Sequence, residues 1–412
     1  MIIKLTIAAV VVAGLAHFGS IAVLLLRSWL HRDRTPTSRP PITILRPACG
    51  IENHVEETLA SAFAIDYPEF EILFCVADSN DPVIALIERL MKEHPQVPSR
   101  LLVGDDRISI NPKLNNTVKG WKAARYEWIV MADSNVLIPP DYLDRVLERW
   151  KSDTGLVCSP PVGTEPEDIG ADLECAFLNT YEARWQLFAD SIGFAFAQGK
   201  TMFWRRDILE AGGGIEALAS EPAEDAASTK LIRAGGRHVR LVVHPFPQPL
   251  GTRHIKDVWN RQLRWARLRR SSFPIVYAPE LLTGGFLPLA GTAALAFADV
   301  IPFSLFLGAF VAWYGAEVAL AKRYGWPVSA RLVLMMVLRD LLMIPLWIGG
   351  WTGNKFVWRG NAMDIKTPAG AELPPFVERL MAARTVRAVM QIVTGRRPVA
   401  DMERGNGASR GG

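Results

Sequence analysis

The sequence predicts an α/β domain, built on a mainly parallel β-sheet, with membrane helices on its amino- and carboxy-terminal sides. In the middle of the 412-residue chain, short apolar runs alternate with helical patterns of one-sided polarity, as in βα repeats. Long apolar stretches near the length of a membrane span lie on either side of this part. The mean hydropathy of +0.14, with 21% charged residues, agrees with a water-facing body that carries membrane segments.

An amino-terminal membrane anchor with a basic flank is expected over residues 1–34. Leu5 to Leu26 is apolar apart from small residues and His17, and a helix of this length can cross a bilayer. Basic residues are concentrated after this run, which places the following domain in the cytosol. They are Arg27, Arg32, Arg34 and Arg39, with only Lys4 before the run. The alternative, a cleaved signal peptide, would need a shorter apolar core and a cleavage site before the arginines.

The α/β domain is expected over residues 35–279, after a proline-rich linker from Thr35 to Pro41. Its buried strands should be nearly continuous apolar runs, namely Ile42 to Leu45, Ile72 to Ala77, Trp128 to Ala132 and Leu241 to Val243. Amphipathic helices lie between them, with Val55, Leu59 and Phe63 on one face of the first and Leu143, Val146, Leu147 and Trp150 on one face of another. A sheet of this kind binds ligands beyond the carboxyl ends of its strands.

Membrane or interfacial helices are expected over residues 280–352. Three apolar runs lie there, Leu281 to Val300, Pro302 to Leu320 and Leu332 to Trp351. Asp299, Arg339 and Asp340 interrupt them, and charges at such depth usually pair with one another or mark an interfacial segment.

Residues 353–412 should form a cytosolic or interfacial tail whose end, from Glu403, is disordered. The tail is basic, so the distribution of positive charge favours the cytosolic side for it. Three crossings after a cytosolic domain would place it outside. We therefore expect one of the three apolar runs not to cross. The basic residues are Lys355, Arg359, Arg379, Arg384, Arg387, Arg396 and Arg397.

The charge balance favours lipid headgroups or phosphates as partners and argues against nucleic acid. The net charge is only +4, and the basic residues lie beside apolar runs rather than in a broad basic face. Four cysteines, Cys49, Cys75, Cys158 and Cys175, are widely spaced and fit reduced thiols in a cytosolic body.

Two aspartates directly follow predicted strands. Asp78, in VADSNDP, is placed to reach a nucleotide base or ribose in the crevice above the sheet. Asp133, in MADSN, is placed to hold Mg²⁺ or Mn²⁺ against a diphosphate, because hard divalent cations take carboxylate and phosphate oxygens. For each of them, an ordinary turn residue that closes a strand is the alternative.

Two later segments offer a base and a cationic clamp. Asp225 follows Glu224 at the start of a helical stretch, where it can accept a proton from an attacking hydroxyl or simply stabilise the helix terminus. Arg261 and Arg264 lie three residues apart on one helical face, with Trp265 beside them. Guanidinium groups there would stabilise a leaving diphosphate, whereas a solvated basic helix on anionic lipid is the alternative.

These elements in this order, with NPKLNN (Asn111 to Asn116) and QGKTM (Gln198 to Met202) between them, resemble the ceramide glucosyltransferases, glycosyltransferase family 21, which have the GT-A fold. The likeness extends from about Pro41 to Pro274. It implies an inverting transfer of a sugar, in first place glucose from UDP-glucose, to the primary hydroxyl of ceramide or a similar lipid. A UDP-sugar donor, a ceramide-like acceptor, a membrane and a divalent metal, Mg or Mn, are the implied partners and cofactor.

The resemblance also implies roles for individual residues. Asp78 would contact the uridine part of the donor, Asp133 the metal and diphosphate, and Asp225 would be the catalytic base. RQLRW would supply the arginine motif through Arg261, Arg264 and Trp265, and Lys113 and Lys200 would be donor-site or structural residues. Two departures are visible: Asp133 belongs to DSN rather than to a full DxD, and the residues after Asp225 are the small AAS.

An aromatic stripe recurs at helical spacing through Phe177, Tyr181, Trp185 and Phe188. It fits either core packing or an interfacial helix that admits the acceptor lipid.

We expect an integral membrane protein whose catalytic domain faces the cytosol, with a bacterial inner membrane as the predicted location.

Three other functions remain open at this point. A related transferase would use another sugar nucleotide or another lipid, such as diacylglycerol or a hopanoid. A processive polysaccharide synthase shares the acidic sites and the arginine motif, but three or four membrane segments are few for an export pore. A membrane scaffold without turnover would not require Asp225 together with the two arginines.

Overall fold

A seven-stranded sheet forms the centre of the body in the computed structural model, which describes residues 1–32, 36, 38–358 and 361–365. Its strand order is β3-β2-β1-β4-β7-β5-β8. The strands are β1 (Ile42–Ala48), β2 (Phe70–Val76), β3 (Ser99–Val103), β4 (Trp128–Ala132), β5 (Thr154–Ser159), β7 (Thr201–Arg205) and β8 (His238–Leu241). β1 pairs in parallel with β2 and β4, whereas β7 runs antiparallel between β4 and β5. The predicted fold class, an α/β body with a mainly parallel sheet, is confirmed.

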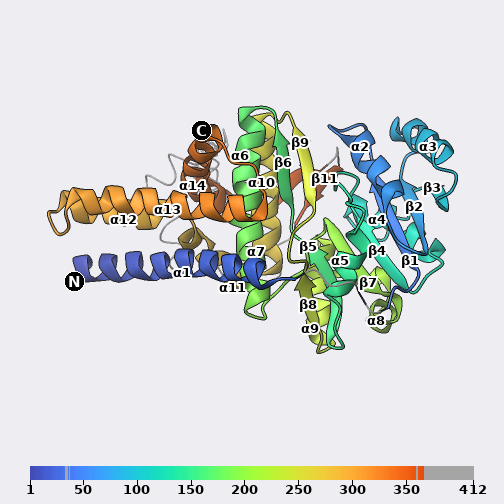
Figure 1. Ribbon diagram of the computed structural model, residues 1–412, viewed down its shortest axis with the longest axis horizontal. Coiled ribbons are helices and arrows are strands. Elements are labelled where there is room, and N and C mark those ends of the chain that lie inside the picture. Colours follow the sequence, from blue (N-terminus) through green and yellow to red (C-terminus); the bar gives the residue numbers. More distant parts are fainter. Residues whose placement is uncertain (33–35, 37, 359–360, 366–412) are drawn as a thin grey trace, which may run out of the picture.

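Helices cover both faces of this sheet (Figure 1). Neighbouring residues of one strand enter different apolar clusters, Leu45 on one face and Ile44 on the other, because side chains alternate along a strand. The helices of the body are α2 (Val55–Ala60), η1 (Ser61–Ala64), α3 (Val83–Glu93), α4 (Pro112–Ala123), α5 (Tyr142–Glu148), α8 (Arg206–Ala211), η3 (Ile215–Ser220) and α9 (Glu224–Ala234). The sheet is buried on both faces, as its continuous apolar runs predicted.

The last predicted strand was placed too late in the sequence. Leu241 to Val243 was expected, but β8 begins at His238 and ends at Leu241. Val242 and Val243 come after the strand and are buried, which accounts for the apolar run that suggested a strand there. β3, β5 and β7 were not predicted, although β7 directly follows the QGK segment.

A second layer separates this sheet from the membrane helices (Figure 1). It contains a parallel pair of strands, β6 (Val162–Pro166) and β9 (Pro247–Gly251), and two long helical segments. One segment runs through α6 (Ile169–Phe177), the π-helical η2 (Leu178–Ala183) and α7 (Arg184–Ser191), and the other is α10 (Ile255–Ser272). This layer therefore stands between the sheet and the apolar helices.

The apolar helices are α1 (Ile2–Leu30), α12 (Phe286–Phe297), α13 (Phe303–Tyr324) and α14 (Ala330–Trp351). Among the described residues α1, α13 and α14 are each long and apolar enough to cross a membrane. The short helices α11 (Pro274–Tyr277) and η4 (Ala278–Thr283) join α12 through a bend of 43° and could form a fourth span with it. The carboxy-terminal run predicted to begin at Leu281 is thus a broken helix.

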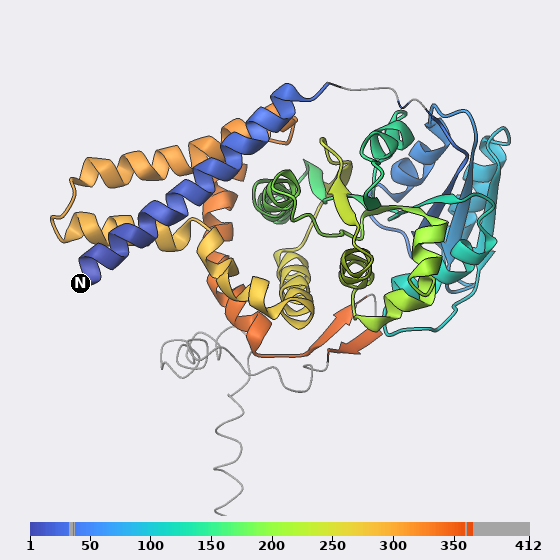
Figure 2. The ribbon, with the colours of Figure 1, turned by 90° about the horizontal axis from the view of Figure 1, so that it is seen from below.

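Helices α1, α12 and α13 project together from the body, whereas α14 runs across their base (Figures 1 and 2). α14 packs on α6 and α10, and 56% of its apolar window is buried inside the protein, against 22% for α1 and for α13. After α14, β10 (Lys355–Trp358) and β11 (Asn361–Asp364) form a hairpin. Outside the described residues lie 33–35, 37, 359–360 and 366–412. They include two positions of the proline-rich linker and the tail with its predicted disordered end.

The charged residues predicted within the apolar helices are paired. Arg339 of α14 donates hydrogen bonds to both carboxylate oxygens of Glu317 of α13, at 3.0 and 3.1 Å. Its guanidinium also lies 2.8 Å from the carboxylate of Asp340 and donates to the hydroxyl of Thr180 in η2 at 2.8 Å. The expectation that charges at this depth pair with one another is confirmed for Arg339 and Asp340.

This network extends to the amino-terminal helix. Arg184 of α7 lies 3.9 Å from Glu317, and its guanidinium donates to Nδ1 of His17 in α1 at 2.7 Å. The His17 ring in turn stacks on Trp313 of α13, with ring centroids 3.6 Å apart. Buried charges thus link three apolar helices to the helical layer of the body, and we call this set the buried ion network.

Replacing Arg339 by leucine should destabilise the protein strongly. The change leaves Asp340 buried without its cation and Glu317 with only the more distant Arg184, and removing one partner of a buried pair costs about 3–5 kcal/mol. Thermal unfolding of the detergent-solubilised variant would measure it. The exposed Lys322→Ala on α13 is the control and should unfold near the wild-type temperature; equal melting temperatures for the two variants would contradict the prediction.

Candidate active site

A buried lysine holds the centre of the candidate site. The ammonium of Lys113, near the start of α4, lies 2.8 Å from the Asp133 carboxylate and 2.8 Å from the Glu224 carboxylate. It also donates to the backbone carbonyl of Gly199 at 2.5 Å. Four separate segments therefore converge on one cation: α4, the end of β4, the approach to β7 and the start of α9.

The fold explains why these segments meet. Asp133 follows β4, and β7 runs antiparallel beside it, so the residue that precedes β7 lies next to Asp133. The Asp133 amide donates to the Lys200 carbonyl at 3.1 Å, and the Lys200 ammonium lies 3.2 Å from the Asp133 carboxylate. Lys200 also donates to the side-chain oxygen of Asn135 at 2.9 Å. Both lysines suggested by the sequence thus contact the same aspartate.

Asn111 fixes the other side of the cluster. Its side-chain oxygen accepts hydrogen bonds from the amides of Lys113 and Leu114, which caps α4. Its side-chain nitrogen donates to Glu224 at 2.6 Å. Asn111 and Glu224 hold the lysine in place, but the sequence argument gave Asn111 no role and considered only a capping role for Glu224.

The charges and burial of the cluster shift the pKa values of its members. Burial alone would raise the pKa of Asp133, but the ammonium groups of Lys113 and Lys200 lower it to about 2, so Asp133 is ionised at neutral pH. Burial lowers the pKa of Lys200, which the neighbouring Arg261 lowers further while Asp133 acts in the opposite direction. Asp133 is therefore a permanent anion held between two cations.

Asp225 has a different environment, although it lies next to Glu224. Its carboxylate accepts hydrogen bonds from the amides of Ala226 at 2.8 Å and Gly199 at 3.2 Å. Burial and the negative charge of Glu224 raise the pKa of Asp225 to about 7, although Lys113 acts in the opposite direction. A carboxylate with a pKa near neutrality is suited to accept a proton in a reaction.

Arg46 supports the Asp133 loop from beneath and was missed by the sequence argument. It is fully buried at the end of β1 and donates to the carbonyls of Thr58, Ser134 and Val136 at 2.6 to 3.4 Å. The predicted strand ended at Leu45, and Arg46 comes directly after it, inside the observed β1. Its guanidinium fixes the backbone that follows Asp133.

Asp78 lies at the same edge of the sheet but outside the lysine cluster. It follows β2, which is separated from β4 by β1. Since neighbouring strands are about 4.8 Å apart, the two strand ends are about 10 Å from each other. The Asp78 carboxylate accepts a hydrogen bond from the Asn80 amide at 2.9 Å, which is the turn geometry named as the alternative. The site therefore has two acidic positions along one edge of the sheet.

The arginine motif lies on α10. Arg261 forms an ion pair with the fully buried Glu174 of α6, which also lies 3.4 Å from Arg253. The positive charge of Arg261 lowers the pKa of Lys200. Arg264 and Trp265 are partly buried on the same helix, and Trp265 packs against the apolar cluster that α6 shares with α13 and α14. The Arg261 side chain itself is held by its ion pair with Glu174.

Three residues of the aromatic stripe pack between the body and the apolar helices. Phe177, Tyr181 and Trp185 belong to one apolar cluster with residues of α13 and α14, and Phe188 packs edge-on against Trp185. Phe177 and Tyr181 also line a small cavity of about 20 Å³ with Gln262 of α10, room for about one water molecule. This placement supports the core-packing interpretation of the stripe.

A divalent metal would find oxygen donors at Asp133 and at the side chain of Asn135. Both already contact lysine ammonium groups, so a cation could bind there only if those lysines moved toward another anion. Mg²⁺ commonly uses one or two carboxylates together with substrate phosphates. The residues therefore fit a metal that binds jointly with a diphosphate better than one held by the protein alone.

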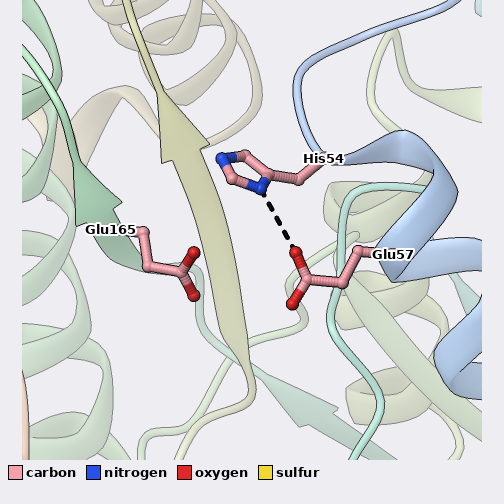
Figure 3. Close-up of side chains that lie close together, drawn as sticks. All are labelled: His54, Glu57 and Glu165. Atoms are coloured by element: carbon pink, nitrogen blue, oxygen red, sulfur yellow. Dashed lines mark hydrogen bonds and ion pairs between the residues drawn. The ribbon is translucent and has the colours of Figure 1, made fainter.

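His54, Glu57 and Glu165 form a second group of possible ligands, shown in Figure 3. His54 is partly buried and both glutamates are exposed; the Nδ1 atom of His54 lies 3.2 Å from the Glu57 carboxylate. This group contains none of the residues singled out in the sequence, and none of its members belongs to the lysine contacts described above.

Comparison with known proteins gives consistent matches. The family model described as Glycosyl transferase family 21 matches residues 10–370. Ceramide glucosyltransferase 3 of Caenorhabditis elegans is 24% identical over 84% of this chain and 77% of its own length. The ceramide glucosyltransferase of Komagataella phaffii is 27% identical over 88% of this chain and 90% of its own length. Among solved structures, a mannosyltransferase from Pyrobaculum calidifontis in complex with GDP-Man and Mn²⁺ is 20% identical over 81% of this chain and 98% of that chain, with a TM-score of 0.48.

Gly199→Ala should disrupt the cluster. A Cβ atom at this position would lie 2.8 Å from the Glu224 carboxylate and 3.1 Å from the Lys113 ammonium. Because misplacing reacting groups by about 1 Å can reduce turnover on the order of 100-fold, we expect a loss of that size with little change in melting temperature. The control is Gly235→Ala at the end of α9, where the new methyl would meet backbone atoms at an ordinary 3.6 Å. Full turnover in Gly199→Ala would refute this account.

Proposed function

The chain belongs to glycosyl transferase family 21 and is a glycosyltransferase, and from this premise we propose that it transfers glucose from UDP-glucose to the primary hydroxyl of ceramide or a similar lipid, with inversion. The observation that carries the proposal is the position of Asp225. Its carboxylate, with a pKa near 7, lies beside the lysine cluster that holds Asp133. A base and a site for a diphosphate are thereby adjacent.

The donor is proposed to lie along the carboxyl edge of the sheet. Asp78 would contact the uridine part, and Asp133 would face the diphosphate about 10 Å further along. The ammonium groups of Lys113 and Lys200 sit at the diphosphate end, where positive charge stabilises the leaving group. Arg261, with Arg264 and Trp265 on the same helix, would close this end.

A divalent cation, Mg or Mn, is proposed to bind with the donor through Asp133. It would supply positive charge to the diphosphate as the bond to the sugar breaks. The protein's own contribution is to keep Asp133 ionised and Asn135 turned toward the same region.

The transfer itself is proposed as a single displacement. Asp225 accepts the proton of the acceptor hydroxyl while the hydroxyl oxygen forms the new bond to the anomeric carbon and the nucleoside diphosphate leaves with its electron pair. Glu224 is held by Lys113 and Asn111, so it remains part of the support rather than the base. One displacement at the anomeric carbon gives the inverted product.

The chain is a membrane protein, and its orientation can be proposed from the helix arrangement. If α1, α12 and α13 enter the membrane and α14 lies along its surface, the catalytic body and the segment after α14 are on the same side. The basic residues after α1 then place both in the cytosol, which also removes the conflict between three carboxy-terminal crossings and a basic tail. A bacterial inner membrane is our proposal for the location, whereas the relatives compared above are from a nematode and a yeast.

Product analysis tests the proposed reaction. Membranes containing the protein are incubated with a panel of radiolabelled sugar nucleotides and with ceramide, diacylglycerol or a hopanoid, and the extracted lipids are separated. We expect labelled glucosylceramide from UDP-glucose. A labelled lipid with another sugar or backbone would reassign the substrate, and water-soluble polymer would identify a polysaccharide synthase.

Asp225→Asn is the matching variant for the catalytic role. It should reduce transfer about 10²–10⁴-fold while nucleotide binding is largely retained, because this is the usual contribution of a general base. Asp66→Asn, an exposed aspartate of the same domain, serves as the control and should be fully active. Unchanged turnover in Asp225→Asn would exclude it as the base.

The pH dependence should follow the titration of Asp225. Only the ionised form accepts a proton, so kcat/KM should fall as the pH drops below about 7 and reach a plateau above it. Glu224→Gln removes a neighbouring negative charge that raises the pKa of Asp225, so the acidic limb should move to lower pH even if the plateau rate falls. An acidic limb that stays in place, or moves to higher pH, would contradict the assignment.

A further inference from the structure

A cavity of about 190 Å³ lies between α12, α13 and α14. Its walls are largely apolar and include Leu289, Ala293, Phe306, Phe310, Val337 and Leu341. It also reaches the protein exterior, because the lining residue Ala290 is exposed. An engineered apolar cavity of about 150 Å³ takes up a benzene molecule, so this one has room for a segment of hydrocarbon chain. We call it the apolar groove.

The polar groups at one end of the groove are already satisfied within the protein. Tyr314 donates to the Asp340 carboxylate at 3.0 Å, and the other oxygen of Asp340 faces Arg339 at 2.8 Å. Neither carboxylate oxygen therefore needs a ligand from the groove. A polar or charged occupant would find no hydrogen-bond partner at this end of the groove, whereas a hydrocarbon chain requires none.

The same end of the groove leads toward the arginine helix through direct contacts. Gly285 packs so closely on Asp340 that a Cβ atom would lie 2.4 Å from its carboxylate. Two residues before it, Thr283 is hydrogen bonded to Tyr181 at 2.8 Å. Tyr181 lines the small internal cavity together with Gln262, the residue after Arg261 on α10. The groove and the arginine motif thus lie at the two ends of one connected series of side chains.

We propose that the apolar groove holds one hydrocarbon chain of the acceptor lipid, with the polar end of that lipid directed toward α10. This inference rests on the proposed function, since it presupposes a lipid acceptor. Three observations favour a lipid chain: the groove is apolar, it opens to the exterior among helices of membrane-spanning character, and it ends where the path to the catalytic body begins. Lipid tails are as apolar as leucine side chains, so the groove contributes orientation rather than hydrophobic transfer free energy.

Filling the groove should therefore affect long-chain acceptors selectively. Ala293→Phe places an aromatic ring on a lining position of α12, and Ala294→Phe places the same ring on the exposed neighbouring position outside the lining. Each purified variant is assayed with UDP-glucose and two acceptors, a long-chain ceramide and a ceramide in which both hydrocarbon chains are truncated. We expect kcat/KM for the long-chain ceramide to fall about tenfold in Ala293→Phe, because the chain loses its orienting site. Values for the truncated ceramide, and for both acceptors with Ala294→Phe, should stay within about twofold of wild type.

A second measurement covers the case in which Ala293→Phe folds poorly. In the wild-type protein, a ceramide with a photoreactive group in one chain should label peptides of α12, α13 or α14 that line the groove, and excess unlabelled long-chain ceramide should reduce this labelling. Equal effects of the two alanine variants on the long-chain acceptor, or labelling confined to other helices, would overturn the groove assignment while leaving the transferase activity standing. Absence of glucose transfer to either ceramide by wild-type protein would instead refute the proposed function.

Discussion

The candidate site depends on one buried cation. The Lys113 ammonium contacts Asp133, Glu224 and the Gly199 carbonyl, which belong to three segments far apart in the sequence. Burial disfavours a charged lysine, but Asp133 and Glu224 raise its pKa well above the usual range, so the ammonium stays charged. Lys113 consequently holds the carboxylates of Asp133 and Glu224 in fixed positions relative to each other. Asp133 and Asp225 have different environments because the lysines contact Asp133 directly, whereas Asp225 is held by backbone amides.

The buried ion network likewise joins separate segments, but outside the sheet. Arg339 and Glu317 join α14 to α13, and Thr180 brings η2 into the same set of hydrogen bonds. Because η2 continues into α6, whose Glu174 holds Arg261, the apolar helices are connected to the arginine motif through consecutive turns of one helical segment. A π-helical turn in this segment agrees with the common occurrence of such turns at functional sites.

The sequence predicted those parts that depend on local pattern. β4 was placed at its observed bounds, and the aspartates after β2 and β4 lie at one edge of the sheet, as parallel pairing requires. What local pattern cannot show is contact between distant segments. The roles of Asn111, Gly199 and Arg46 depend on partners many residues away, and no local pattern indicates that Lys113 and Lys200 contact the same carboxylate. The break in the first carboxy-terminal apolar run lies at Gly284 and Gly285, where tertiary packing against Asp340 overrides the apolar pattern.

Charge balance gives an independent reason to expect a divalent cation with the donor. Lys113 and Lys200 are positive, but Asp133 and Glu224 already match them, and Arg261 is matched by Glu174. A diphosphate that binds here brings further negative charge. The positive charges of Lys113, Lys200 and Arg261 are already balanced by carboxylates and do not neutralise it. Asp225, which must be ionised before it can accept a proton, adds still more negative charge. The site therefore favours a donor that arrives with its own cation, and the lysines can then turn from Asp133 toward the phosphate oxygens as the leaving group gains charge. In this view the two lysines keep Asp133 ionised and in place before the donor binds, and they stabilise the leaving group afterwards.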